Sequence, residues 1–520
     1  MKVHLGRLHV ALLSGVALAA VSSGFAEASE SNEARIARLE AALAELQGEL
    51  RELKAASAAS RAEVRPDVVS PPPPPPVAPP VASPAVTASL DNGRPTLSSS
   101  DGQFSASIRA LMQLDGAIHD QDDAGPLATD FRRGSFDDAA ENDRARDLGN
   151  GFNFRRLRIG VEGKAFGDFQ YNFTYEFGGS GNEDSGTVNA AWVQYGGLGF
   201  ARLRFGAFAP TTSLGDAVSA SGSVFVERPS VVEVVRALAG ADTRKGAGLF
   251  AGGERWTLGG TVTGNLTGVQ THDEQLGFVG RATVVPYRVD GSLIHLGFNA
   301  NLIIDPATTG PDVPGGAPSP IRLRERPELR VDSTRLVDTD HIDADGVTAL
   351  GVEFGAQHNA FYVQAEYFDI AVERRASLLP DPRFSGWYLQ GSWVLTGERR
   401  VYNAGAAGFE SPRPARIFSL EKGNWGAWEL AMRYSVLDLN FRENDLPTLG
   451  SIRGGEQEIL SLGLNWYLNP AVSMQFSYRN VSVDRTSPGG TAFGAGVTPG
   501  LGLQVGQDLN IYSLRTQYAF

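Results

Sequence analysis

The chain has 520 residues, of which 42% are hydrophobic, and it contains no cysteine. The absence of cysteine excludes disulfides, thiolate metal sites and a cysteine nucleophile. The formal net charge is −13 at pH 7, which argues against a nucleic-acid-binding protein, because such proteins present basic surfaces.

Residues 1–26 have the pattern of a secretory signal peptide. Lys2 and Arg7 precede an apolar stretch over residues 10–21, and small residues follow up to Ala28. The stretch is too short for a transmembrane helix, which needs about 20 residues. A basic start, a short apolar core and a small-residue exit are typical of a cleaved signal. The sequence therefore predicts export, with cleavage after residue 26 or 28; the alternative is a buried N-terminal helix.

Residues 29–60 are predicted to form a short coiled-coil helix. Apolar residues repeat there at alternating spacings of three and four: Ile36, Leu39, Leu43, Leu46, Leu50 and Leu53. This seam predicts self-association, provided that the rest of the protein already holds the helices close together. The alternative is a lone amphipathic helix that lies on the barrel or on peptidoglycan.

Residues 61–100 are expected to be a proline-rich linker. The six consecutive prolines from Pro71 to Pro76 favour an extended, semi-rigid polyproline conformation. The linker would hold the helix away from the following domain.

Residues 101–520 are predicted to form an all-β domain, a 16-stranded antiparallel transmembrane β-barrel. Phe169, Phe173 and Phe177 alternate with polar residues, so that one face of the strand is apolar and the other polar. No second layer is predicted to cover so many apolar faces, which favours a barrel with its apolar face toward lipid. The predicted strands are 102–118, 153–166, 168–178, 187–196, 201–209, 245–252, 255–264, 275–286, 291–302, 346–357, 359–372, 383–396, 425–437, 457–468, 471–484 and 507–520.

The links between these strands alternate between tight turns and long polar loops, as in outer-membrane barrels. The long links are 119–152, 210–244, 303–345 and 485–506. The link 397–424 breaks this rule, because it is long but falls on the side of the tight turns. Either it folds into the pore or the strand count is wrong there.

Several segments resemble the phosphate-selective porin (porin O and P) family, and the resemblance covers roughly residues 150–520. They are Phe154–Lys164, Arg204–Pro210, Val224–Pro229, Leu395–Glu398, Gly426–Ser435 and Leu464–Asn469. The resemblance implies a trimeric 16-stranded barrel whose third external loop folds inward and constricts the lumen. The loop from Pro210 to Arg244 matches that loop in position. The scarcity of lysine departs from the lysine-rich phosphate-binding members.

Passage of anions needs positive charge that faces water at a narrow point. Because Leu203 and Phe205 mark the lipid side of their strand, Arg204 and its neighbour Arg202 face the lumen. The candidate residues of the anion path are Arg156, Arg158, Lys164, Arg202 and Arg204 on strands, and Arg228, Arg236, Arg244 and Lys245 in or beside the loop. The same alternation places five further arginines inside: Arg109, Arg281, Arg433, Arg479 and Arg515. The alternative is an ordinary porin lumen, in which arginines are paired with acids.

The predicted function is therefore an outer-membrane porin for passive diffusion of small polar solutes, with anions such as phosphate as the favoured class. The alternatives are a general or cation-preferring porin, or a structural tether between the outer membrane and the periplasm. No phosphate-binding glycine loop or Gly-x-Ser-x-Gly elbow occurs, and the seven histidines lack metal spacing. We therefore expect no enzyme activity, cofactor or metal. The expected partners are outer-membrane lipid, a homotrimer of the chain, small solutes and peptidoglycan, with the coiled coil in the periplasm.

Overall fold

The computed structural model of the chain describes residues 85–121, 148–179, 186–308, 319–489 and 501–520, without residues 92 and 242 and with six separate helical positions between 41 and 51. The chain divides into two units after Ala82. The expected signal peptide, most of the coiled-coil helix and the linker up to residue 84 lie outside the described residues. Among the described residues, no helix is long and apolar enough to cross a membrane.

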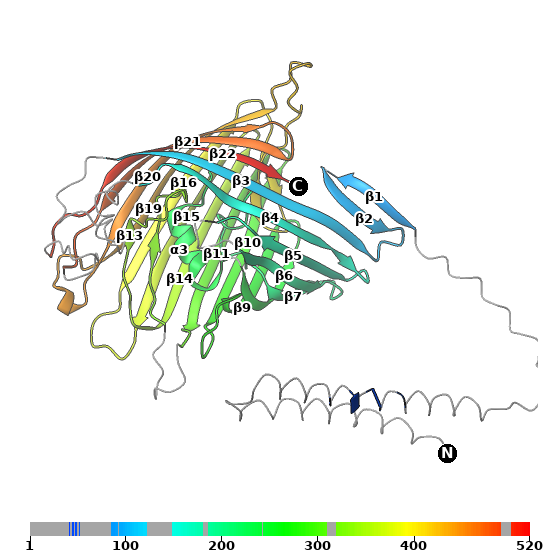
Figure 1. Cartoon of the computed structure of the whole chain (residues 1–520). Coiled ribbons are helices and arrows are strands. Elements are labelled where there is room, and N and C mark those ends of the chain that lie inside the picture. Colours follow the sequence, from blue (N-terminus) through cyan, green and yellow to red (C-terminus); the bar gives the residue numbers. More distant parts are fainter. Residues whose placement is uncertain are drawn as a thin grey trace, which may run out of the picture. The chain divides into compact units, whose positions relative to one another are not determined.

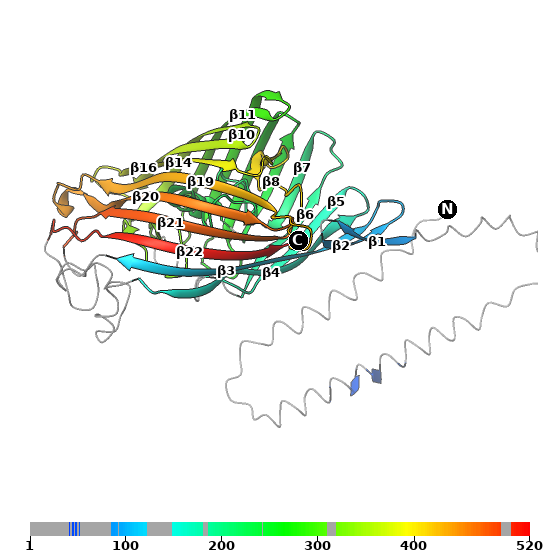
Figure 2. The ribbon, with the colours of Figure 1, turned by 90° about the horizontal axis from the view of Figure 1, so that it is seen from above.

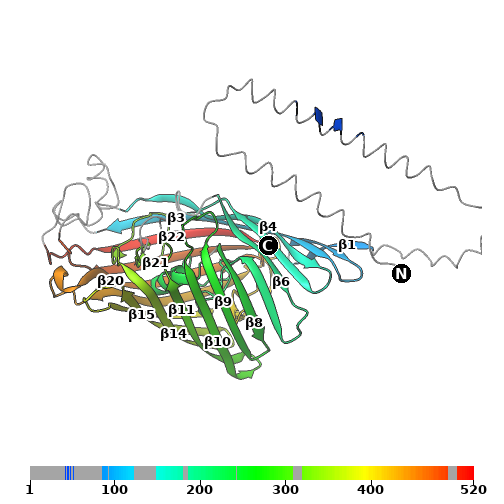
Figure 3. The same cartoon turned by 90° about the horizontal axis from the view of Figure 1, so that it is seen from below.

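Sixteen antiparallel strands form a closed barrel in the second unit. They are β3 (Ser105–Gln121), β4 (Gly151–Ala165), β5 (Phe169–Glu176), β6 (Thr187–Tyr195), β7 (Ala201–Ala207), β8 (Arg244–Gly252), β9 (Trp256–Leu266), β10 (Leu276–Val289), β11 (Ser292–Asp305), β14 (Ala344–His358), β15 (Phe361–Arg374), β16 (Arg383–Val394), β19 (Ala427–Phe441), β20 (Ile452–Tyr467), β21 (Val472–Asp484) and β22 (Asp508–Ala519). The ring closes where β22 pairs with β3, from Leu509 opposite Gln121 to Ala519 opposite Leu111 (Figures 2 and 3). The predicted 16-stranded antiparallel barrel is confirmed, and each predicted strand overlaps one strand of the ring.

The barrel wall has an apolar outer face and a polar inner face, as period-two alternation dictates. On β5, Phe169 and Phe173 are 42% and 56% exposed, whereas Asn172 is 3% exposed. Because the exposed side chains of the wall are the apolar ones, the outer face suits contact with lipid.

Residues 86–99 form a hairpin of β1 (Val86–Asp91) and β2 (Arg94–Ser99). β2 pairs with the first residues of β3, from Thr96 opposite Ser107 to Ser98 opposite Ser105. This segment falls within the range expected to be linker. Its sequence alternates, with Val86, Ala88 and Leu90 on one face, and this pattern favours a strand over a proline-rich spacer.

Part of the interior is filled by the segment that connects β7 to β8. It contains α3 (Ser230–Ala239), which lies inside the ring of strands (Figure 1). Val231 and Val235 are fully buried and belong to a core cluster with inward-facing Phe368 and Ile370. The apolar core of this barrel therefore lies between its wall and an inward-folded segment.

Two smaller elements lie in the connection between β11 and β14. These are β12 (Arg324–Glu325) and β13 (Val337–Asp338), which pair with each other. Leu323 and Leu336 of this connection join the core cluster around α3. A 3-10 helix, η5 (Pro447–Leu449), lies between β19 and β20.

The long link between β16 and β19 folds into the barrel from the end that carries the tight turns. It contains the hairpin of β17 (Val401–Asn403) and β18 (Gly408–Glu410). Arg281 of the wall donates hydrogen bonds to the carbonyls of Ala406 and Ala407, both at 2.9 Å. The fully buried Phe409 packs on Tyr362, with ring centroids 4.8 Å apart. Of the two explanations for this link, inward folding is correct and the strand count holds.

Candidate functional site

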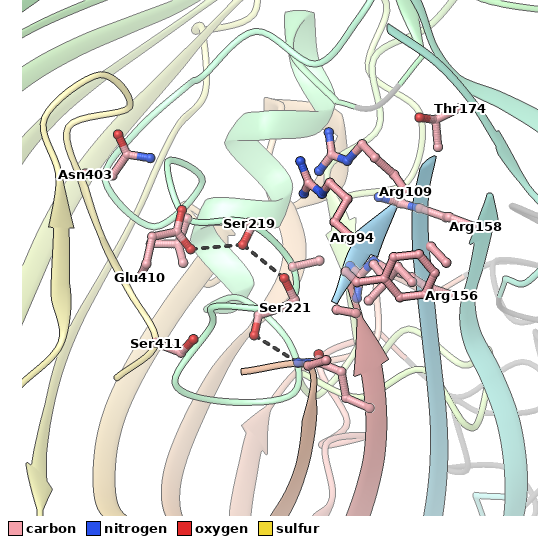
Figure 4. Close-up of a pocket in the computed structure, with 18 of the residues that line it drawn as sticks. Arg94, Arg109, Arg156, Arg158, Thr174, Ser219, Ser221, Asn403, Glu410 and Ser411 are labelled. Atoms are coloured by element: carbon pink, nitrogen blue, oxygen red, sulfur yellow. Dashed lines mark hydrogen bonds between the residues drawn. The ribbon is translucent and has the colours of Figure 1, made fainter. Parts of the chain in front are cut away.

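A cavity of about 1070 Å³ opens inside the barrel near the tight-turn end. Strands β1 to β7, β21 and β22, the segment before α3 and the β17–β18 hairpin line it. Figure 4 shows Arg94, Arg109, Arg156 and Arg158 on one side of the cavity and Asn403, Glu410 and Ser411 on the other. The cavity contains space that a solute could occupy, so we treat it as the candidate lumen.

The lining of this cavity is rich in arginine. Its basic residues are Arg94, Arg109, Arg156, Arg158, Arg204, Arg228, Arg236 and Arg413. Only two acids, Asp216 and Glu410, belong to the same lining. The carboxylates that bind the wall arginines are not part of it: Glu162 binds Arg94 and Arg109, and Glu176 binds Arg158. The surface that a solute would meet is therefore predominantly cationic.

Two ion-pair groups hold the inward segment in place. The first joins α3 to the residues before it. Asp216 accepts from Arg236 Nε at 2.7 Å and lies 3.2 Å from Arg228 Nη2. Glu233 binds Arg228 at 3.0 Å and Arg330 at 3.1 Å. Burial alone would raise the pKa of Glu233, but Arg228, Arg236 and Arg330 lower it to about 2, so this carboxylate stays ionised at neutral pH.

The second group joins Glu227 of the inward segment to the wall. Its carboxylate lies 2.7 Å from Arg155, 3.8 Å from Arg156 and 3.1 Å from Arg515. Arg515 also binds Asp115 at 2.6 Å. Burial would raise the pKa of Glu227, yet the surrounding arginines hold it well below its ordinary range.

A β-bulge explains why two consecutive arginines point inward. Gln113 of β3 pairs with Arg156, but the next residue, Leu114, pairs with Phe154. Arg155 is thus an extra residue in β4, and both arginines are buried, at 5% and 3% exposure. Strict alternation would have turned Arg155 toward lipid.

The inward segment and the β17–β18 hairpin meet in the middle of the barrel. Ser219 donates to Glu410 at 2.9 Å, and Arg400 donates to the carbonyl of Gly222. Arg400 is also paired with Glu429 of the wall at 2.9 Å. The hairpin therefore contacts the inward segment from the tight-turn end of the barrel.

The structure brings five of the nine candidate residues to the cavity lining: Arg156, Arg158, Arg204, Arg228 and Arg236. The other four lie elsewhere. Arg244 is buried and donates to the carbonyls of Ala237, Leu238 and Gly240, so it caps the end of α3.

Lys245 binds Glu274 and pairs in register with Ala207, on the face of Phe205 and Leu249. Lys164 is exposed near the tight turn after β4, and Arg202 lies two residues before Arg204. None of these three belongs to the cavity lining.

Two lining arginines were missed as candidates. Arg94 comes from β2, in the expected linker, and Arg413 comes from the long link between β16 and β19. The alternation over residues 86–91 could have revealed the first. Nothing in the local sequence indicates the second, because it depends on the path of the link. Arg155 was missed because a bulge depends on the pairing with the neighbouring strand.

The fold and the lumen together define a porin-type channel: a closed 16-stranded barrel, apolar outside and polar inside, with an inward loop that narrows it. The sequence comparisons assign the family. Residues 128–520 match the family described as phosphate-selective porin O and P, and the chain belongs to this family. It is therefore an outer-membrane channel protein of bacteria, and the resemblance seen in the sequence is confirmed.

The individual relatives share only a small part of their sequence with this chain. The chain is 25% identical to Porin O of Pseudomonas aeruginosa over 358 residues, which cover 64% of this chain and 77% of Porin O. Among solved structures, it is similar to an anion-selective porin from Comamonas acidovorans (13% identity, 80% of this chain and 100% of that chain, TM-score 0.44). It is also similar to the outer-membrane channel DcaP of Acinetobacter baumannii (9% identity, 81% and 99%, TM-score 0.43).

Proposed function

We propose that the channel admits small polar solutes by passive diffusion and prefers anions, with phosphate among them. The observation that carries this proposal is the lining of the cavity, with eight arginines and two acids. The low-dielectric wall of a narrow lumen strengthens the field of such charges. The planar guanidinium group also binds two oxygens of a phosphate or carboxylate at once.

The position of the acids supports a net preference of the channel for anions. Glu162, Glu176, Glu227 and Glu233 neutralise much of the arginine charge, but they are not part of the lining. A passing ion is therefore nearer to the guanidinium groups than to these carboxylates. If the interaction free energies of a monovalent anion and a monovalent cation with the lining differ by about 1 kcal/mol, the channel prefers the anion about fivefold.

The test is the reversal potential of the full-length protein in a planar bilayer under a KCl gradient, at low and high salt. Anion preference that weakens with salt supports the proposal, because salt screens fixed charges. Cation preference would refute it and would show that the acids set the field. Competition of phosphate with the chloride current then tests phosphate as a solute.

We further propose that the protein is a homotrimer and that residues 29–60 form a periplasmic coiled coil that stabilises it. The heptad seam and the trimer implied by the family resemblance support this proposal. Light scattering of the detergent-purified protein would give the subunit number, and a monomer would refute both statements.

A further inference from the structure

Arg204 differs from most of the arginines around it. It lies on β7 and lines the cavity, and its guanidinium carbon is 4.2 Å from the ring centroid of Trp192. The rings of Phe208 and Phe250 lie at 5.3 and 5.2 Å. Three aromatic rings therefore surround one cation inside an aqueous lumen.

The charge of Arg204 is not neutralised by an ion pair. Its Nε and Nη2 both donate to Oε1 of Gln194, at 3.1 and 2.9 Å. Within the described ranges, no carboxylate lies within 4 Å of this guanidinium, whereas Arg158 and Arg228 each bind an acid. Cation–π contact stabilises the guanidinium without cancelling its charge, so Arg204 keeps its capacity to bind an anion.

Glycines in the neighbouring strands make this arrangement possible. A Cβ atom at Gly248 would lie 2.6 Å from the ring of Phe250, and one at Gly259 would lie 2.9 Å from it. Phe250 therefore lies across two glycines and reaches Arg204. Gly206 pairs in register with Trp192 and has no side chain, which leaves room for Arg204 over the indole.

The surroundings of Arg204 combine polar and apolar groups. Trp192 and Phe208 line the cavity, and so do the polar side chains Asn172, Thr174 and Asn189 from β5 and β6. A doubly charged phosphate would gain little from ring faces, since it loses bound water there. A singly charged carboxylate on a planar ring could bind the guanidinium and place its ring against the aromatic side chains.

We propose that Arg204, Trp192 and Phe208 form a binding site for aromatic monocarboxylates within the channel. This proposal rests on the proposed function, because a carboxylate must first enter an anion-admitting pore. The site selects for the ring as well as for the charge.

The experiment compares benzoate with acetate, which carry the same charge at pH 7 and differ in the ring. Each is titrated against the chloride current of the full-length protein in a planar bilayer, with a protein-free bilayer as the control for effects on lipid. We expect benzoate to reduce the current at about tenfold lower concentration than acetate, since ring stacking in a partly dry site is worth about that factor.

Two variants separate the ring from the charge. In Trp192→Leu, the concentration of benzoate that halves the chloride current should lie within about twofold of the concentration of acetate that does so. The acetate titration itself should be unchanged. Arg204→Gln should weaken both, and Arg204→Lys, which keeps the charge but not the planar fork, should lie between it and the original protein. Arg383→Gln, at an exposed ion pair with Asp369 on the outer face, is the matched control and should change neither titration.

Equal block by benzoate and acetate in an anion-selective channel would overturn the site but leave the proposed function standing. Benzoate block that Trp192→Leu does not weaken would also overturn it, because the ring would then bind elsewhere. Cation selectivity of the original protein would refute the proposed function itself, and the aromatic site with it.

Discussion

Replacing Glu227 with glutamine should strengthen the anion preference of the channel. The glutamate is 3% exposed and lies among Arg155, Arg156 and Arg515. With Asp115, these groups carry three positive and two negative charges, a net charge of +1. The substitution raises this net charge to +2 next to Arg156, which faces the cavity. The amide oxygen of glutamine can still accept a hydrogen bond from Arg155.

The size of the effect follows from the distance and the dielectric environment. Glu227 lies behind Arg156, and one unit charge at about 8 Å is worth about 0.5 kcal/mol in water and about 2 kcal/mol at a protein surface. A hydrated ion that passes in front of Arg156 lies between these two cases, at about 1 kcal/mol, so we expect about a fivefold higher ratio of chloride to potassium permeability. Loss of one partner from a buried ion pair also costs about 3–5 kcal/mol of stability.

The assay is the reversal potential of inserted channels under a KCl gradient, so that the loss of stability does not enter the result. Glu227→Asp is the matched control. It disturbs the packing but keeps the negative charge, and it should retain the original permeability ratio. An unchanged or lower ratio in Glu227→Gln would refute the reasoning, since it would mean that the field at the lumen is not set by this cluster.

Three other predictions concern the inward segments and the N-terminal region. Because its pKa is lowered to about 2, Glu233 gives a stabilisation that is fully present above the ordinary carboxylate pKa and is lost progressively as pH falls from there through about 2. Hydrogen exchange of α3, corrected for the intrinsic rate, should therefore show equal protection at pH 7 and pH 6 and lower protection by pH 3, and equal protection at pH 6 and pH 3 would contradict this. Deleting residues 29–82, which end at the boundary before β1, should preserve conductance and weaken the oligomer; failure to insert would contradict it. Phe409→Ala should destabilise the β17–β18 hairpin by about 3–5 kcal/mol and raise single-channel conductance, whereas Leu420→Ala at a 75% exposed position should change neither.

The sequence was sufficient to predict the barrel, because each strand carries its own alternation of apolar and polar residues. Phe169 and Phe173 point outward as predicted, and all sixteen strands are where the pattern placed them. The inward direction of Arg158 and Arg204 followed from the same local rule.

The remaining features depend on contacts between segments that are distant in the chain. Arg155 faces inward because β3 and β4 pair with a bulge; the three-residue spacing of the outward Phe154 and Leu157 indicates a slip in the alternation, but not the direction of Arg155. A register shift also separates Arg244 from Gly246. As a result, Arg244 caps α3 and Lys245 points away from the lumen. The long link between β16 and β19 was recognisable as an exception, but its path became visible only in the contacts of Arg281 and Phe409.

The contact between the inward segment and the β17–β18 hairpin has a consequence for how such a channel could change its bore. The two segments arise from opposite ends of the barrel and touch through Ser219, Glu410, Arg400 and Gly222. A joint between two insertions thus occupies part of the interior that the strand ring encloses. Substitutions at this joint could widen or narrow the passage while every interstrand hydrogen bond of the wall stays in place. Permeability and the integrity of the membrane-embedded wall can therefore vary independently in this protein.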